Sequence, residues 1–148
     1  MTSDDAGVSR LQAPAAVRAW LDSFVDSSRS GAGGELAELF AEVFLSGEPG
    51  GAATVPRATF LAALPSRERL FRAAGWTDPR LETARYEPLG EHFGALVTTW
   101  QVAGLDGGGR SLQLRSSFVL RLHGDRAEVI AYLNDQDLRA LLGASGGG

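Results

Sequence analysis

Few side chains in this sequence carry the chemistry of general acid–base catalysis near neutral pH. The two histidines, His92 and His123, lie far apart in the chain, and neither has a carboxylate at a spacing that would orient its imidazole. His123 directly precedes the turn residues Gly124 and Asp125, which favours an exposed hairpin position over a role as a base. Because metal ligands occur in clusters with characteristic spacing, the sequence predicts no metal site.

Tyrosines are the next candidates for chemistry. Tyr86 and Tyr132 both fall within predicted strands, and a tyrosine hydroxyl can donate a hydrogen bond to a ligand carbonyl, as an oxyanion-binding group does. More often a strand tyrosine buries its ring and satisfies its hydroxyl at the rim of the core. We favour that second interpretation for both residues.

A locally basic segment lies just before the middle of the chain. It contains four arginines and is interrupted by Glu68; the arginines are Arg57, Arg67, Arg69 and Arg72. Such a segment could clamp an anionic ligand, but a solvated helix face is the interpretation we favour.

The composition excludes other chemistries. The chain of 148 residues has no cysteine, and all 14 basic residues are arginine, which excludes a disulfide framework, a thiolate metal site, and cysteine or lysine catalysis. The net charge of −4 argues against nucleic acid as a partner, because phosphate binding needs a basic face. No apolar run approaches the ~20 residues that span a bilayer, and the N-terminus does not resemble a signal peptide. We therefore expect a cytoplasmic protein without membrane contact, and the Ala/Gly/Arg bias suggests a bacterial one.

Residues 110–134 are predicted to form a β-hairpin. Apolar and polar side chains alternate from Leu112 to His123 and again from Ala127 to Leu133, which predicts two antiparallel strands around the intervening turn. Residues 81–87 and 95–102 show the same period and predict two further strands.

Helical periodicity precedes these strands. A helix opened by Pro14 carries an apolar stripe, formed by Val17, Trp20, Leu21, Phe24 and Val25. A second helix is predicted from Glu35, with Leu36, Leu39, Phe40, Val43 and Phe44 on one face. A third helical region begins at Pro56 and either kinks at Pro65 or restarts there.

The order of elements predicts one α+β domain. Asn134 has the character of an N-cap for a short closing helix through Leu142, so the order is three helices, four antiparallel strands and a last helix. Helices grouped before strands are expected to cover one face of the sheet. The domain spans residues 14–142, between a flexible N-terminal segment (1–13) and a glycine-rich tail (143–148).

Several segments together resemble a known family. They are AVRAWLDSF and GELAELFAEVF, followed by LVTTWQV, LRSSFVLRL and RAEVIAYLNDQDL on consecutive strands. This order resembles the nuclear transport factor 2-like superfamily, in its bacterial SnoaL-like, polyketide cyclase-like branch. The resemblance covers about residues 14–142. It implies a cone, in which a strongly curved antiparallel sheet wraps around the N-terminal helices and encloses a mostly apolar pocket. It also implies a homodimer formed through the outer face of the sheet.

The resemblance gives the alternating strand faces a role. The residues expected to face the interior are Leu96, Trp100, Leu114, Ser116 and Phe118. The candidate ligand-binding residues are Trp100, Leu114, Ser116, Phe118, Tyr132 and Asn134, and the alternation leaves the facing of Tyr132 open. SnoaL-like cyclases carry an aspartate after the last strand's aromatic segment, where this chain has Asn134, which cannot accept a proton. Asp135 lies one residue later, and a shift of one residue reverses the facing of a strand. His92 is a second weak candidate, at the mouth of the pocket, and Tyr86 is a third.

These observations predict a SnoaL-like domain that binds a small, mostly apolar molecule in the cone, with no identifiable catalytic set and no cofactor. One alternative is an enzyme of the polyketide cyclase, ketosteroid isomerase or dehydratase type, using acid–base chemistry by His92, Tyr86 or Asp135. A second alternative is a non-catalytic homodimeric scaffold whose cone is filled.

Overall fold

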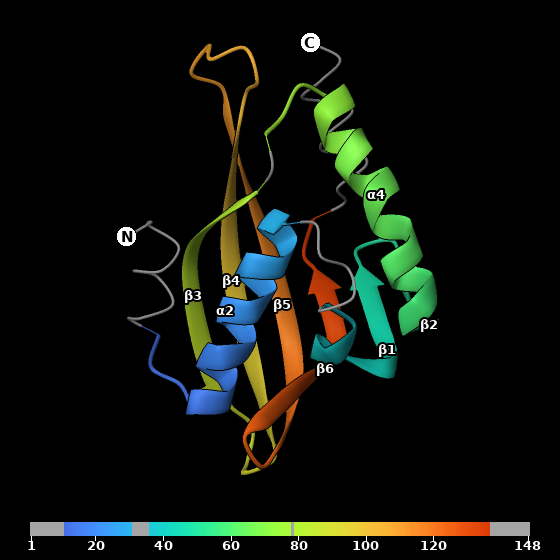
Figure 1. Ribbon diagram of the computed structural model, residues 1–148, viewed down its shortest axis with the longest axis vertical. Helices are drawn as coiled ribbons and strands as arrows, with labels where there is room; N and C mark the ends of the chain where they lie inside the picture. The colour runs from blue at the N-terminus through green and yellow to red at the C-terminus, as the bar shows by residue number, and fades with distance from the viewer. Residues whose placement is uncertain (1–10, 31–35, 78, 137–148) are drawn as a thin grey trace.

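The computed structural model describes residues 11–30, 36–77 and 79–136. In these ranges two long helices, one short 3₁₀ helix and six strands follow one another along the chain (Figure 1). The elements are α2 (Ala15–Ser30), η1 (Ala37–Leu39), β1 (Phe40–Glu48), β2 (Gly51–Pro56), α4 (Arg57–Ala73), β3 (Arg80–Pro88), β4 (Phe93–Ala103), β5 (Ser111–His123) and β6 (Arg126–Asn134).

The first predicted helix is confirmed as α2. The carbonyl of Pro14 accepts the first hydrogen bonds of the helix, from the backbone N–H groups of Val17 (3.0 Å) and Arg18 (3.1 Å). This is the arrangement expected of a proline at the start of a helix, where a missing N–H costs nothing. The predicted apolar stripe faces the core, since Val17, Trp20 and Leu21 are all buried.

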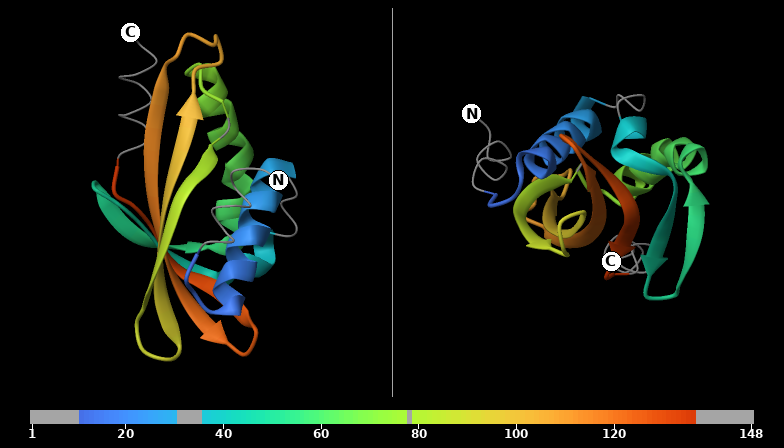
Figure 2. Two further views of the ribbon diagram at one scale, coloured as in Figure 1. Left: turned by 90° about the vertical axis from the view of Figure 1, so that its left-hand side faces the viewer. Right: turned by 90° about the horizontal axis from the view of Figure 1, so that it is seen from below.

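The six strands form one mixed sheet in the order β2-β1-β6-β5-β4-β3. All neighbouring strands are antiparallel except β1 and β6, which pair in parallel. The predicted meander is confirmed for β3, β4, β5 and β6. Figure 2 shows the sheet strongly curved, with α2 and α4 against its concave side, so the expected α+β architecture is confirmed.

The helix predicted from Glu35 is wrong from Phe40 onward, although the short η1 lies within its range. After η1 the chain becomes extended, and Phe40 to Glu48 form strand β1. Phe40 and Phe44 are buried, while Val43 and Leu45 are exposed on the other face. A spacing of four residues places two side chains on the same side of either a helix or a strand, so the apolar pattern did not separate the two. The register of β1 against β6 shifts between Phe40 and Leu45, which also disturbs regular alternation.

A second hairpin was missed together with β1. Glu48 pairs with Gly51, so Pro49 and Gly50 form a tight turn between β1 and β2. The third helical region is confirmed as α4, which runs from Arg57 to Ala73 with Pro65 inside it, so the helix does not restart at the proline. Asn134 is the last residue of β6, and the rest of the predicted closing helix lies almost entirely outside the described residues.

Aromatic side chains fill the space between the helices and the concave face. Trp20 stacks on Phe24 with ring centroids 5.1 Å apart, and Phe40 contacts both Phe44 and Phe60. Leu11, which precedes α2, is also buried in this core. None of the described helices is both long enough and apolar enough to cross a membrane.

Candidate functional site

Tyr132 is a buried phenol near the end of β6. Its ring stacks on Phe118 of β5, with centroids 5.1 Å apart and planes 9° from parallel. Phe60 of α4 meets the same ring edge-on at 5.8 Å. The ring is thus held on two sides by apolar groups, and only 6% of the residue is exposed.

The hydroxyl of Tyr132 is surrounded by polar side chains from three elements. Arg67 of α4 donates a hydrogen bond from Nη1 to this oxygen at 3.1 Å, and its guanidinium carbon lies 5.9 Å from the ring centroid. The polar side chains of Ser116 on β5 and Asn134 on β6 also act on this hydroxyl and lower its pKa. Ser116 donates to Asn134 Oδ1 at 2.9 Å. We call Arg67, Ser116, Tyr132 and Asn134 the phenol cluster.

Strand pairing explains why three members of the phenol cluster meet. Ser116 pairs with Asn134 and Phe118 pairs with Tyr132 in the β5–β6 ladder. Directly paired residues of antiparallel strands project to the same face, so the alternation that placed Phe118 inside also places Ser116, Tyr132 and Asn134 inside.

Opposing effects act on the pKa of Tyr132. Burial is the largest effect and would raise the pKa, but the positive charge of Arg67 and the hydrogen bonds from Arg67, Ser116 and Asn134 together outweigh it. The pKa is therefore lowered from the ordinary value of 10.0. A site that favours the phenolate favours negative charge at this point in the interior.

A second buried hydrogen-bond chain adjoins the cluster. Trp100 Nε1 donates to Thr98 Oγ1 at 2.7 Å, and that hydroxyl donates to the carbonyl of Ser116 at 2.8 Å. The indole N–H of Trp100 is therefore satisfied within the protein, and the residue presents its ring rather than its polar atom to the interior. Leu114 is buried one pleat further along β5.

Arg67 was not predicted as a site residue. The run of arginines around it predicted a solvated helix face, but Arg67 lies on the inner face of α4. The available signal was its spacing: Phe60 is seven residues before it and Phe71 four residues after it, and both pack in the core. Residues at these spacings share one side of a helix.

The folded architecture can be compared with known structures. A protein of unknown function from Nostoc punctiforme with a cystatin-like fold superposes with a TM-score of 0.63 at 12% identity, covering 82% of this chain and 89% of that one. A nuclear transport factor 2-like protein from Novosphingobium aromaticivorans gives 0.60 at 19% identity, covering 82% and 79%. The chain has the nuclear transport factor 2-like fold.

A third solved structure also has a similar fold. A candidate polyketide cyclase from Pseudomonas putida, similar in the same way, gives a TM-score of 0.57 at 15% identity, covering 88% of this chain and 97% of that one. No family model matches the sequence, and no curated protein matches it. At these identities the likeness describes the nuclear transport factor 2-like fold and not an activity.

Both histidines lie away from the phenol cluster. They line an open groove of about 1100 Å³ between the start of α2 and the turns that end β3 and β5, together with Glu91 and Asp125. His92 and His123 are exposed, and the backbone carbonyl of His92 accepts the N–H of Leu122 at 2.7 Å. Among the described residues no group of three or more potential ligands is placed to hold a metal ion.

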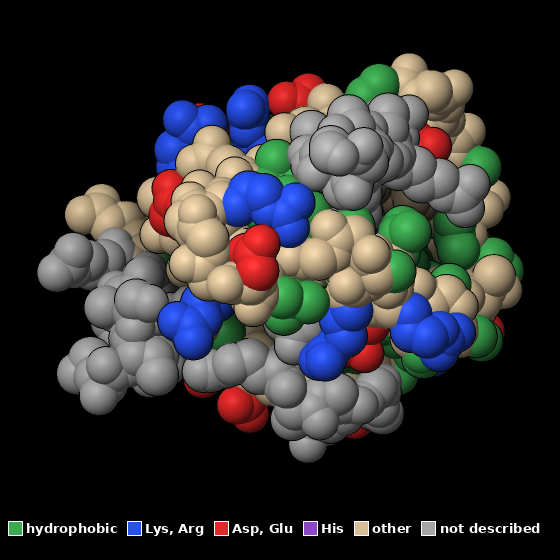
Figure 3. Space-filling view, turned by 90° about the horizontal axis from the view of Figure 1, so that it is seen from above, with side chains coloured by type: hydrophobic (Ala, Val, Ile, Leu, Met, Phe, Trp, Pro, Cys, Tyr) green, Lys and Arg blue, Asp and Glu red, His purple; other side chains and the backbone are tan. Residues whose placement is uncertain are grey.

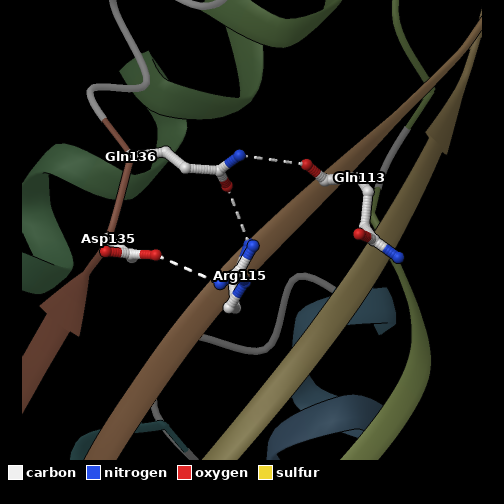
Figure 4. Close-up of polar contacts among 4 residues, drawn as sticks. All are labelled: Gln113, Arg115, Asp135 and Gln136. Carbon is white, nitrogen blue, oxygen red and sulfur yellow. Dashed lines mark hydrogen bonds and ion pairs between the residues drawn. The ribbon is translucent and has the colours of Figure 1, made fainter.

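Asp135 also lies outside the cone interior. Its carboxylate accepts a hydrogen bond from Arg115 Nη1 at 3.2 Å, and 69% of its side chain is exposed (Figure 4). The side chain of the next residue, Gln136, forms hydrogen bonds to the backbone of β5, as the backbone of one more strand residue would. Its side-chain oxygen accepts the N–H of Arg115 (3.0 Å), and its nitrogen donates to the carbonyl of Gln113 (3.4 Å). Asp135 is thereby turned to the outer side of the sheet, as the reversed facing predicts.

Tyr86 lies on β3, remote from Tyr132. It is half-buried and its ring covers Gly94 of β4, so closely that a methyl group at Gly94 would collide with it. Burial raises the pKa of Tyr86 above 10.0. The structure therefore brings together Tyr132, Asn134, Ser116, Phe118, Trp100 and Leu114, and it leaves His92, Asp135 and Tyr86 elsewhere.

Alkaline titration should separate the two tyrosines of the chain. Tyr132 is expected to ionise below pH 10 and Tyr86 above it, giving two steps in near-ultraviolet phenolate absorbance. Because Tyr132 ionises more readily in the folded chain than in the unfolded chain, its ionisation adds stability as pH rises from the lowered pKa to about 10, and adds none below. Arg67→Gln should abolish the lower step and Tyr86→Phe the upper one. A single step near pH 10 in the unmodified protein would contradict this description.

Proposed function

We propose that the protein binds a small, mostly apolar molecule at the phenol cluster, between α4 and strands β5 and β6. The observation that carries this proposal is a small polar cluster in an aromatic interior, where Arg67 donates to the buried Tyr132 hydroxyl and Ser116 donates to the neighbouring Asn134. Ligand sites in proteins combine an apolar lining with a few fixed polar groups that orient the ligand. Phe118, Trp100 and Leu114 would supply the lining, and Tyr132 and Asn134 the orienting contacts.

Titration with 2-naphthol by calorimetry tests this proposal. We expect saturable binding of one molecule per chain, and about tenfold weaker binding to Tyr132→Phe, since loss of one hydrogen bond of ~1.4 kcal/mol corresponds to that factor. Tyr86→Phe is the matched control and should bind like the unmodified protein. Equal affinities for all three proteins would place the ligand elsewhere. Native mass spectrometry of the purified protein would also reveal a retained natural ligand.

An acid–base enzyme of the SnoaL-like, cyclase or isomerase type is the second candidate. The lowered pKa of Tyr132 favours it, because a phenol that ionises more readily is a better proton donor to a ligand carbonyl. The likeness to a candidate polyketide cyclase agrees with this alternative. Deuterium exchange next to the carbonyl of 2-tetralone separates the two functions. An enzyme would accelerate the exchange through Tyr132, whereas a binding protein would leave its rate unchanged.

We further propose that two copies of the chain associate through the outer face of the sheet. Two rows of small or apolar residues cross β1, β6, β5 and β4 on this face. One row is Leu45, Ala131, Val119 and Ala95, and the other is Gly47, Leu133, Ser117 and Val97. Ion pairs border the rows, Arg115 with Asp135 on one side and Arg121 with Glu128 on the other. An apolar centre with a charged rim is typical of a protein interface.

A further inference from the structure

Arg67 is a charged residue in a position where the helix otherwise buries apolar side chains. Phe60 and Phe71 lie on the same face of α4 and pack in the core, while Arg67 between them is half-buried. An arginine cannot discharge by losing a proton, so its partial burial must be compensated by partners. In this environment the side chain donates one hydrogen bond, to the hydroxyl of Tyr132.

Three other arginines have hydrogen-bond or ion-pair partners that compensate their positive charge. Arg57, at the start of the same helix, donates to the carbonyls of Ala37 and Phe40, each at 3.1 Å. Arg115 and Arg121 pair with Asp135 and Glu128. Within residues 11–30, 36–77 and 79–136, no carboxylate forms an ion pair with Arg67. Among those residues its charge is met by one side chain, that of Tyr132, through both its hydroxyl and its ring.

The neighbours of Arg67 reinforce the positive character of this point. Ser116 and Asn134 lower the pKa of the Tyr132 hydroxyl, as Arg67 does. No aspartate or glutamate belongs to the phenol cluster. Seen from the end at which α4 and β6 finish, the surface carries arginine side chains and some acidic ones, with hydrophobic side chains between them (Figure 3). The cluster is thus suited to hold an anion beside apolar surface.

We propose that the ligand of the phenol cluster carries a carboxylate on an apolar ring system, and that Arg67 binds this carboxylate. A guanidinium has five N–H donors in a planar fork that matches the two oxygens of a carboxylate, and the bond to Tyr132 uses one of them. Asn134 in this position supplies an amide donor where an acidic side chain would repel the ligand. This inference rests on the proposed function and narrows it to an aromatic or alicyclic acid.

The test compares 2-naphthoate with 2-naphthamide, which has the same rings and a neutral amide, by calorimetry at neutral pH. We expect the unmodified protein to bind 2-naphthoate at least tenfold more tightly. Arg67→Gln should remove that preference, so that its affinities for the two compounds lie within about twofold of each other. Arg67→Lys keeps the charge without the fork and should retain part of the preference. Arg69→Gln is the matched control, because Arg69 is an exposed arginine of the same helix, and it should preserve the preference.

Each other outcome has a defined meaning. Equal affinities of the unmodified protein for the two compounds would overturn the carboxylate inference and leave the proposed apolar site intact. An undiminished preference in Arg67→Gln would overturn the assignment to Arg67. Failure of both compounds and of 2-naphthol to bind would overturn the proposed function, and the carboxylate inference with it. Circular dichroism of each variant shows whether it is folded, and Arg67→Lys supplies the comparison if Arg67→Gln is not.

Discussion

Replacing Phe118 with alanine is expected to lower the free energy of unfolding by about 3–5 kcal/mol. The side chain is 1% exposed, and its ring contacts Trp20 of α2 at 5.0 Å, Phe24 at 5.3 Å and Tyr132 of β6 at 5.1 Å. It thus joins the first helix to the last strand. Removing it takes apolar area out of the core and leaves a cavity that the surrounding rings fill only in part.

Urea denaturation followed by circular dichroism measures this loss. Domains of ordinary stability unfold with about 5–15 kcal/mol, so Phe118→Ala would shift the midpoint far toward low urea. Phe93→Ala is the control, since Phe93 is 40% exposed at the start of β4 and should change stability by only about 0.5 kcal/mol. A similar small change for Phe118→Ala would show that its ring does not join α2 to β6 as described.

Placing aspartate at Leu133 is expected to prevent self-association through the outer sheet face. Leu133 is 37% exposed at the centre of the two apolar rows, and its side chain packs across Gly47 of β1, 2.9 Å from the position that a Cβ atom would take there. A symmetric interface brings the same patch of both copies together, so the new carboxylates would be desolvated close to one another. That juxtaposition costs several kcal/mol, which weakens the dimer by at least roughly a hundredfold.

Sedimentation equilibrium checks the prediction. The unmodified chain should sediment as a dimer and Leu133→Asp as a monomer. Leu70→Asp introduces the same charge at a 42% exposed leucine on α4, away from the sheet, and should leave the dimer intact. A monomeric unmodified protein would contradict the proposed interface, and dissociation of both variants would show that charge alone, rather than this face, controls association.

Local periodicity predicted the strands that follow α4 because one face of each is buried. Every second residue of β4 is buried, namely Leu96, Thr98, Trp100 and Val102. An alternation of this kind can be recognised from the sequence alone. Strand β1 could not be identified in this way, because the spacing of Phe40 and Phe44 fits either structure. What decides its conformation is the edge of β6, a segment far along the chain, and such non-local effects override local pattern.

The candidate site divides in the same way. Ser116 and Phe118 were predicted to face the interior because alternation assigns strand facing once the hairpin is recognised. Tyr132 and Asn134 were candidates as well, but alternation left the facing of Tyr132 open. The β5–β6 register shifts between Val119 and Leu120, and this irregularity lets both Val129 and Tyr132 be buried. Arg67 was missed because its role depends on how α4 lies across the sheet, which the sequence does not show. Arginine side chains are also mostly exposed in proteins, so its residue type favoured a solvent-facing position. Asp135 shows the converse, since its carboxylate suits catalysis but its position in the strand register directs it outward.

The parallel pairing of β1 with β6 has a consequence for how the molecule forms. Phe40 pairs with Val129, so roughly 90 residues of chain must be in place before this ladder can close, and contacts of such long sequence separation slow folding. During synthesis α2, β1, β2 and α4 all emerge before β6, so β1 cannot pair with β6 until the later strands have been made. The meander of β3, β4, β5 and β6 closes through shorter loops and offers a template onto which the earlier segment docks last. Substitutions in the β1–β6 ladder should therefore act mainly on the rate of unfolding, and those in the β5–β6 hairpin mainly on the rate of folding.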